Sequence, residues 1–230
     1  MSSKIVLLSQ LDAISNVPGI KFSDNDRICI IPVCCRSDQV TDCSSFTSFY
    51  GPNGDKGKRF RRTLFQNGAK EENLFFVNYY DPHSYQNCKR ILSANYILLP
   101  GGLMELGVER LKKTNLDIVL SQFSGTIICF SAGGIMLFDK YIIVPNPVYR
   151  DLEIVNGIGL LDSNQFVIDV HFDDTNLEQI AWLEKACNTF HKTIYAISQL
   201  GYIVIEGKHI TSYSGARVFK ESISSTLNGR

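Results

Sequence analysis

Short apolar runs rich in β-branched residues recur along the chain, and mixed apolar and polar stretches long enough for helices separate them. This alternation is typical of βαβ units, in which helices connect parallel strands. The runs are almost continuously apolar, which favours strands covered by helices on both faces. We predict strands at residues 5–8, 28–33, 74–77, 96–99, 126–130, 166–170, 193–197 and 202–205.

Two intervening segments have the periodicity of amphipathic helices. In residues 105–113 apolar side chains alternate with charges, and in residues 176–190 apolar side chains recur at helical spacing. Each helix is expected to pack one face on the sheet. Residues 34–60 are instead rich in Ser, Asp, Gly and Asn, so we predict a long loop there that borders the active site.

The length and composition describe one globular unit. The 230 residues are 44% hydrophobic and 20% charged, and no linker-like or strongly charged block divides them. We therefore expect a single domain, residues 1–230, of two or three layers with one large core.

Charge and segment composition exclude several classes of partner. Lys and Arg together number 23, as do Asp and Glu, so the field that attracts nucleic acid or an anionic membrane is missing. The first apolar run is too short for a signal peptide, and no run of about 20 apolar residues could cross a bilayer. These features predict a cytoplasmic protein.

The seven cysteines are read as free thiols in a reducing compartment. Their number is odd, and no C-x-x-C pair of the kind used for zinc or redox chemistry occurs. The chain also lacks a Gly-x-Gly-x-x-Gly or Walker-type phosphate loop. We expect no metal and no organic cofactor.

Residues 125–139, GTIICFSAGGIMLFD, read as a buried strand, a serine and the start of a helix. A serine on a sharp turn at the carboxyl end of a central strand presents its hydroxyl to a crevice, as a nucleophile does. The N–H groups and dipole of a following helix would favour an oxyanion beside Ala132. The alternative, with similar weight on these residues alone, is that Ser131 only caps a helix.

Two further segments support the first interpretation. Residues 96–106, YILLPGGLMEL, place Gly101 and Gly102 at another strand end, where their amides could complete an oxyanion hole or form an ordinary turn. Residues 166–174, FVIDVHFDD, place His171 at the end of an alternating strand, where it could accept the serine proton or be structural. The other histidines lie in less suitable places: His83, His191 and His209.

The succession LLPGG, CFSAGG and NGIGLLDSNQFVIDVHFDD resembles the S51 peptidase family, which contains dipeptidase E and cyanophycinase. The resemblance extends from residue 5 to about residue 217. It implies a flavodoxin-like, class I glutamine amidotransferase-like fold: a three-layer α/β/α sandwich with a mostly parallel central sheet. It also implies that Ser131 attacks a peptide carbonyl, that His171 is the base, and that the amides of Gly102 and Ala132 hold the oxyanion.

The chain departs from the family pattern at the substrate side. Leu103 and Met104 stand where relatives carry polar groups that contact substrate, and Cys129 stands where glycine is frequent. No arginine occurs in residues 173–188, the region in which dipeptidase E-like relatives read an acidic substrate side chain. A preference for N-terminal aspartate is therefore not expected.

The third member of a catalytic triad is not evident. Cyanophycinase-like relatives carry a glutamate in the segment that corresponds to residues 196–202, which here offers Ser198 and Gln199 but no acid. A Gln199 oxygen could fix the imidazole tautomer without stabilising its charge. Asp139 is the other candidate, as an orienting acid or a solvated helix-end carboxylate, and Asp151 is a more distant one.

These observations favour a serine-type peptidase or hydrolase that acts on a small peptide or amide through an acyl-enzyme. The alternative is a catalytically weak or silent member of the fold that binds a small molecule or a partner protein. A cysteine amidotransferase ranks last, because the turn holds Ser131 and not a thiol. The basic stretch at residues 56–62, KGKRFRR, is read as a solvated helix face, with an anion-binding patch as the alternative. A homodimer is left open.

Overall fold

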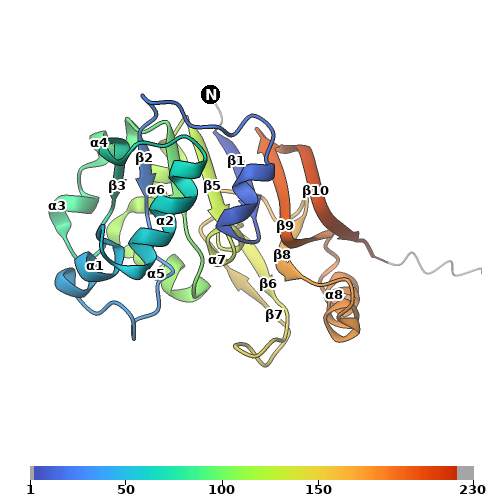
Figure 1. Ribbon diagram of the computed structural model, residues 1–230. Helices are drawn as coiled ribbons and strands as arrows, with labels where there is room; N and C mark the ends of the chain where they lie inside the picture. Colours follow the sequence, from blue (N-terminus) through green and yellow to red (C-terminus); the bar gives the residue numbers. More distant parts are fainter. Residues whose placement is uncertain (1–2, 222–230) are drawn as a thin grey trace, which may run out of the picture.

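The computed structural model describes residues 3–221, which form a mixed eight-stranded sheet with helices on both faces (Figure 1). Seven strands follow the order β10-β9-β1-β5-β4-β2-β3, and β8 pairs with β9. The pairs among β1 to β5, and the β8–β9 pair, are parallel, whereas β9 runs antiparallel to β1 and β10. The strands are β1 (Lys4–Leu8), β2 (Ile28–Ile30), β3 (Leu74–Phe76), β4 (Tyr96–Leu99), β5 (Thr126–Phe130), β8 (Val167–Phe172), β9 (Ile194–Glu206) and β10 (His209–Phe219).

The helices form two layers around this sheet. The 3-10 helix η1 packs on α2 in front of the sheet in Figure 1, while α5 contacts α6 and α7 behind it. The bounds are η1 (Leu11–Asn16), α1 (Cys43–Tyr50), α2 (Asp55–Gln66), η2 (Glu71–Asn73), α3 (Pro82–Tyr85), α4 (Cys88–Leu92), α5 (Met104–Thr114), α6 (Leu116–Gln122), α7 (Ala132–Ile135) and α8 (Leu177–Phe190). The expected α/β sandwich with a mostly parallel sheet is thus the observed architecture. No helix in residues 3–221 has the length and apolar character needed to span a membrane.

The predicted loop at residues 34–60 is wrong in its second half, which contains α1 and the start of α2. Asp42 and Ser45 form a reciprocal capping box at the start of α1, and Phe46 and Tyr50 bury one face of it. Gly57 of α2 lies so close to α1 that a Cβ there would be 1.9 Å from the Gly51 carbonyl oxygen. The polar and glycine-rich composition reflects helix caps and close helix packing.

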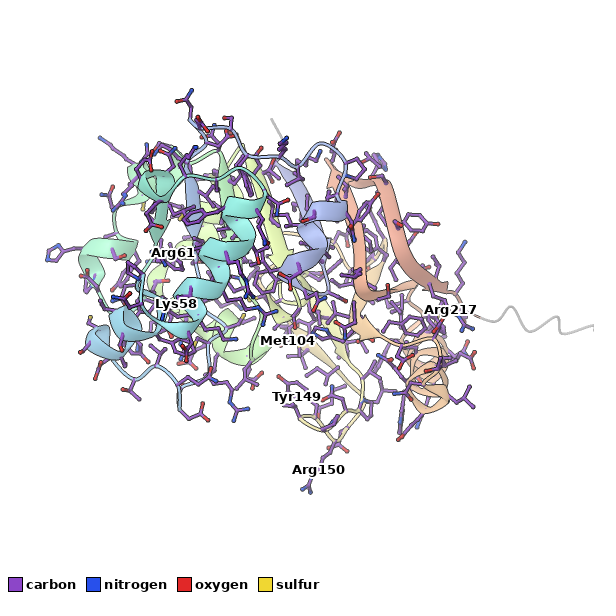
Figure 2. The ribbon with its side chains drawn as sticks, viewed as in Figure 1. Lys58, Arg61, Met104, Tyr149, Arg150 and Arg217 are labelled. Atoms are coloured by element: carbon purple, nitrogen blue, oxygen red, sulfur yellow. The ribbon has the colours of Figure 1, made fainter. Side chains whose placement is uncertain are left out.

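The basic stretch at residues 56–62 lies on α2, and its Lys and Arg side chains are exposed as expected of a solvated face, except that of Arg61, which is mostly buried. Arg61 pairs with Glu71 at 2.9 Å, and Arg59 lies 3.7 Å from Asp12. Figure 2 shows Lys58 and Arg61 on this helix, far from the loop that carries Arg150.

The carboxyl-terminal strands differ most from their predicted bounds. The strands predicted at 193–197 and 202–205 are one continuous strand, β9, and the residues between them form an irregularity: Tyr202 pairs with Ser214 of β10, and the next pair is Ile197 with Ala216. The backbones of β9 and β10 lie very close together at Gly201, since a Cβ there would be 2.3 Å from the Gly215 carbonyl oxygen. β10 itself was not predicted, because it is an edge strand with mostly exposed polar side chains.

A separate hairpin leaves the sheet beyond α7. It consists of β6 (Lys140–Ile143) and β7 (Glu153–Asn156), which pair antiparallel. The loop between them projects below the carboxyl ends of the parallel strands in Figure 1. Because Tyr149 donates a hydrogen bond to Glu105 of α5 (2.8 Å), this loop is tied to the main domain.

Candidate active site

Ser131 lies at the sharp turn between β5 and α7. Its backbone has φ 53° and ψ −132°, a conformation that residues other than glycine rarely adopt. Its neighbours are small by necessity: a Cβ on Gly101 would lie 2.5 Å from the Ser131 Cβ, and one on Gly133 would lie 2.1 Å from the Leu99 carbonyl oxygen. The turn is therefore a strained elbow that directs the hydroxyl outward.

The helix expected after the serine is only one turn long. α7 ends at Ile135, and the chain then turns into β6. The dipole of so short a helix is small, so the expected stabilisation of an oxyanion would depend on the individual backbone N–H groups.

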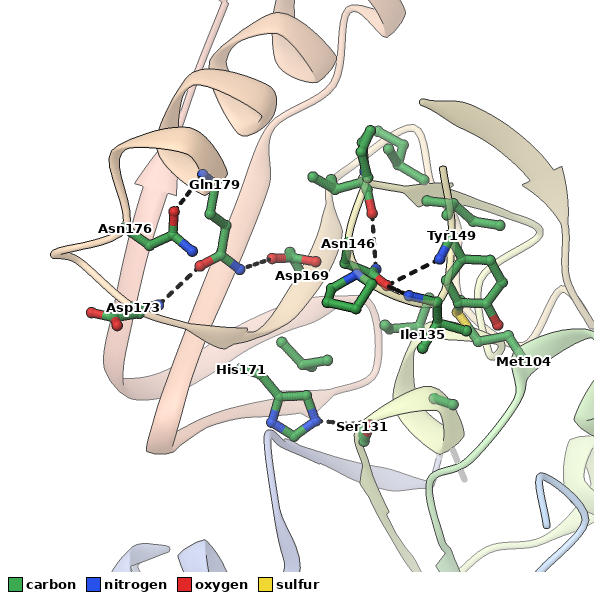
Figure 3. Close-up of a pocket in the computed structure, with 18 of the residues that line it drawn as sticks. Met104, Ser131, Ile135, Asn146, Tyr149, Asp169, His171, Asp173, Asn176 and Gln179 are labelled. Atoms are coloured by element: carbon green, nitrogen blue, oxygen red, sulfur yellow. Dashed lines mark hydrogen bonds between the residues drawn. The ribbon is translucent and has the colours of Figure 1, made fainter. Parts of the chain in front are cut away.

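His171 is paired with this hydroxyl. It lies near the end of β8, and its Nε2 atom is 3.0 Å from the Ser131 Oγ atom (Figure 3). The other three histidines are elsewhere: His83 in α3, His191 at the end of α8 beside Glu221, and His209 at the start of β10. The two residues singled out from separate motifs are therefore neighbours.

Gln199 of β9 occupies the far side of the imidazole. Its Oε1 atom is 3.3 Å from the Nδ1 atom of His171. An N–H at Nδ1 donated to this oxygen leaves the Nε2 lone pair free to face the serine hydroxyl. A neutral group thus stands where a triad carboxylate would stand.

The acidic candidates are placed elsewhere. An oxygen of Asp139 accepts a hydrogen bond from the Ser163 N–H (2.7 Å), which holds the pKa of this carboxyl below its usual value. Asp139 lines a second cavity together with Asp162 and Lys208, not the cleft of Ser131. Asp151 is exposed in the turn before β7.

Gly102 and Ala132 are the residues whose amides were expected to hold an oxyanion. Both line the same cleft as Ser131. Gly102 has φ +148°, and a Cβ there would be 1.9 Å from the Cys34 carbonyl oxygen, so only glycine fits. That carbonyl accepts the N–H of Leu103 (2.8 Å), which anchors the loop. Of the two predicted substrate-side residues, Met104 lines the cleft and Leu103 does not line it.

The cleft has a volume of about 930 Å³ and two unlike walls. One wall is apolar. It consists of Met104 of α5, Ile135 of α7, and residues 142–144 at the end of β6, which are Ile142, Ile143 and Val144. The other wall is polar and comes from β8 and the start of α8: Asp169, Asp173, Asn176, Glu178 and Gln179. No residue of 34–60 lines the cleft within the described part of the chain. The segment expected to border the active site reaches it at Cys34, whose carbonyl oxygen lies against Gly102 and accepts the N–H of Leu103.

Asp169 is a cleft residue that sequence reasoning missed. It accepts a hydrogen bond from the Gln179 side-chain amide (3.0 Å), and burial raises the pKa of its carboxyl to about 6 (Figure 3). Its signal in the sequence was an acid inside the otherwise apolar run FVIDV. A charged residue in such a run requires a partner or a function.

The elbow strand carries a cysteine, Cys129, two residues before Ser131. Cys129 is fully buried in β5, and burial raises its pKa, so it is a poor nucleophile. Among residues 3–221, no group of three or more His, Cys, Asp and Glu side chains is arranged to hold a metal ion.

Comparison with known proteins gives the class of fold. A protein designated a candidate peptidase E, from Listeria monocytogenes EGD-e, matches with a TM-score of 0.64 and 16% identity over 94% of this chain and 99% of its own. A peptidase from an acI-B1 Actinobacterium matches with a TM-score of 0.56 and 14% identity over 96% and 95% of the two chains. No protein-family model and no curated protein matches the chain. At these identities the likeness shows that the chain has the fold of the peptidase E structures.

Proposed function

We propose that the protein is a serine-type hydrolase that cleaves a small peptide or amide, with Ser131 as nucleophile and His171 as base. The observation that carries the proposal is the 3.0 Å contact between the Ser131 Oγ and His171 Nε2 atoms in a strained elbow that opens on a cleft. A helix-capping serine needs neither a histidine partner nor a cleft. The peptide-cleaving designation of both structural relatives adds support.

The chemistry follows the usual order for an activated serine. His171 Nε2 accepts the hydroxyl proton while Oγ bonds to the substrate carbonyl carbon, and the carbonyl electrons move to oxygen. The N–H groups of Gly102 and Ala132 would donate to that oxyanion. The imidazolium then gives its proton to the departing amine, which leaves an acyl-serine. Water, deprotonated by His171, hydrolyses this ester and restores the enzyme.

Gln199 limits this scheme. Its oxygen orients the ring, but unlike a carboxylate it does not offset the positive charge that develops on His171. This observation favours a second candidate function, a slow or silent member of the fold that binds a small molecule.

The charges of the cleft bear on the substrate. Asp169, Asp173 and Glu178 line one wall of the cleft. Besides His171, the basic side chain that lines the cleft is Arg150. Arg150 is on the loop of the hairpin, and Figure 2 shows its side chain projecting away from the domain. An acidic wall repels carboxylates, so the proposed substrates are neutral or cationic near the cleaved bond.

Labelling with a fluorophosphonate probe tests the proposal without knowledge of the substrate. Wild type should be labelled, whereas Ser131→Ala should lose labelling and His171→Ala should retain only a slow residual rate. His209→Ala is the matched control, because it removes a histidine from the start of β10 and should label like wild type. A wild-type protein that is folded and unlabelled would contradict catalysis and favour the silent alternative.

A further inference from the structure

Ser9 has no role in the chemistry described above, yet it contacts the backbone of His171. It follows β1 directly, is fully buried and does not line the cleft. Its hydroxyl donates a hydrogen bond to the Ile197 carbonyl oxygen (2.6 Å) and accepts one from the His171 N–H (2.8 Å). One hydroxyl therefore joins three strands: β1, β9 and β8.

This hydroxyl lies at an irregularity of the sheet. Val170 of β8 pairs with Ile197 of β9, but Phe172 pairs with Ser198, so the register skips His171. His171 accordingly has φ 57°, outside the extended region of a regular strand. The Ser9 hydroxyl is inserted between an N–H of β8 and a carbonyl of β9, at the position of the bulge.

The residue before Ser9 holds the nucleophile. The Leu8 carbonyl oxygen accepts a hydrogen bond from the Ser131 N–H (3.0 Å), which extends the β1–β5 pairing to the elbow. Two consecutive residues at the end of β1 thus bind the backbones of both reacting side chains.

We infer that Ser9 is a positioning residue that keeps the His171 ring beside Ser131; this inference rests on the proposed function. Without the hydroxyl, the His171 N–H and the Ile197 carbonyl would be buried without partners unless β8 and β9 closed on each other. Closure would remove the bulge and return His171 to an extended backbone, and the side chain would then turn away. Substrate binding would persist, because Ser9 is outside the cleft.

The first test is the rate of fluorophosphonate labelling. Ser9→Ala should lower the maximal rate about 100-fold or more, as expected for the loss of a general base, and leave the probe concentration at half-maximal rate unchanged. Thr63→Val is the matched control. Thr63 is also buried, its hydroxyl donates a hydrogen bond to Asp12 (2.9 Å), and neither residue lines the cleft. This variant should label within about threefold of wild type.

Ser9→Cys covers the case in which Ser9→Ala does not fold. A thiol nearly keeps the shape but makes weak hydrogen bonds, so its labelling rate should fall between those of wild type and Ser9→Ala. If folded Ser9→Ala or Ser9→Cys labels as fast as Thr63→Val, the inference is wrong.

A double-mutant cycle separates positioning from general destabilisation. If Ser9 acts through His171, adding Ser9→Ala to His171→Ala should leave the slow residual rate unchanged. Equal fold losses in the presence and absence of the His171 ring would contradict the inference.

Imidazole ¹⁵N NMR separates failure of this inference from failure of the proposed function. Ser9→Ala should shift the ring resonances of His171 and leave those of His83 and His209 in place, whether or not wild type reacts with the probe. An unlabelled wild type contradicts the proposed function alone. Unchanged His171 resonances in Ser9→Ala overturn the positioning role.

Discussion

The backbone of Ser131 is strained. Its φ of 53° and ψ of −132° are accessible to glycine and costly for other residues, by about 1–3 kcal/mol. The close packing of the surrounding glycines, and the hydrogen bond from the Ser131 N–H to the Leu8 carbonyl oxygen, impose this conformation. The elbow that directs the hydroxyl into the cleft therefore lowers the free energy of unfolding.

Two substitutions should separate strain from reactivity. Ser131→Ala and Ser131→Gly should both abolish labelling, but the glycine variant should be the more stable by on the order of 1 kcal/mol, because it relieves the elbow. Urea unfolding measures the difference. Equal stability of the two variants would mean that the elbow holds no strain.

Gln199 offers a gain-of-function test. Gln199→Glu places a carboxylate at the His171 Nδ1 atom and should raise the rate about tenfold or more, because the carboxylate offsets the positive charge that develops on the ring. The gain should stay below the about 10⁴-fold that charge and tautomer are worth together, because the Gln199 oxygen already fixes the tautomer. Gln199→Ala is the control and should not be faster than wild type. An unchanged rate, with a crystal structure showing the new carboxylate on Nδ1, would mean that a missing charge does not limit this protein.

Asp169 gives a prediction for the pH dependence of stability. Its pKa is raised from 3.8 to about 6, so below pH 3.8 the carboxyl is protonated in both states and costs nothing. Between pH 3.8 and 6 the unfolded state ionises first, and the native state loses stability that it does not regain at higher pH. Asp169→Asn should therefore stabilise the protein at pH 8, by on the order of 1–3 kcal/mol, and much less at pH 4.

The exposed Asp173 is the matched control for this experiment. Hydrogen bonds from Thr175 lower the pKa of its carboxyl, so ionised Asp173 favours the folded state and Asp173→Asn should give no stabilisation at pH 8. Urea unfolding of both variants at pH 4 and pH 8 makes the comparison. A stabilisation by Asp169→Asn that is equal at both pH values would exclude ionisation as its cause.

At the scale of elements, the interior strands were the most predictable. The runs at 5–8, 96–99 and 126–130 coincide with β1, β4 and β5, because strands buried on both faces admit apolar residues alone. α1 is short, and Ser and Thr occupy its exposed face, so its sequence resembles a loop. The pairing of β10, on the edge, is set by β9 and not by its own polar residues.

The contact between α1 and α2 leads to a prediction with an unusual sign. Glycine to alanine inside a helix normally stabilises it by about 1 kcal/mol. Gly57→Ala should instead destabilise the protein by about 1–3 kcal/mol, because the new Cβ would overlap the Gly51 and Tyr50 carbonyl oxygens at 1.9 and 2.5 Å. Lys56→Ala, at an exposed position of the same helix, should change little. A stabilising Gly57→Ala would contradict the close packing.

Across the whole molecule, the parallel strands gather the predicted residues at one edge of the sheet. Ser131 and Gly102 follow β5 and β4, and His171 ends β8, so all three meet where carboxyl ends converge. The motifs could therefore be found from strand ends. Ser9 also follows a strand, and Asp169 is an acid in an apolar run, but the sequence does not show what either contacts, because their partners, His171 and Gln179, lie 162 and 10 residues away and only the fold brings them together.

The cleft as a whole should discriminate by charge. Dipeptides with neutral or cationic side chains should be hydrolysed faster than their aspartyl and glutamyl counterparts, because an acidic wall disfavours a second carboxylate. Hydrolysis of a matched dipeptide set, with Ser131→Ala as the blank, measures the preference. Fastest turnover of the aspartyl member would contradict it.

The position of β1 has a consequence for synthesis of the protein. β1 is synthesised before the other strands of the sheet, yet its partners are β5 and β9, which end at residues 130 and 206. A nascent chain therefore carries this apolar strand with one edge unpaired until β9 has been translated. Chaperones that bind apolar strands should engage this protein early and release it late. The Leu8 carbonyl and the Ser9 hydroxyl, at the end of β1, bind the backbones of Ser131 and His171. Both contacts can be present only after β9 has been translated and has paired with β1.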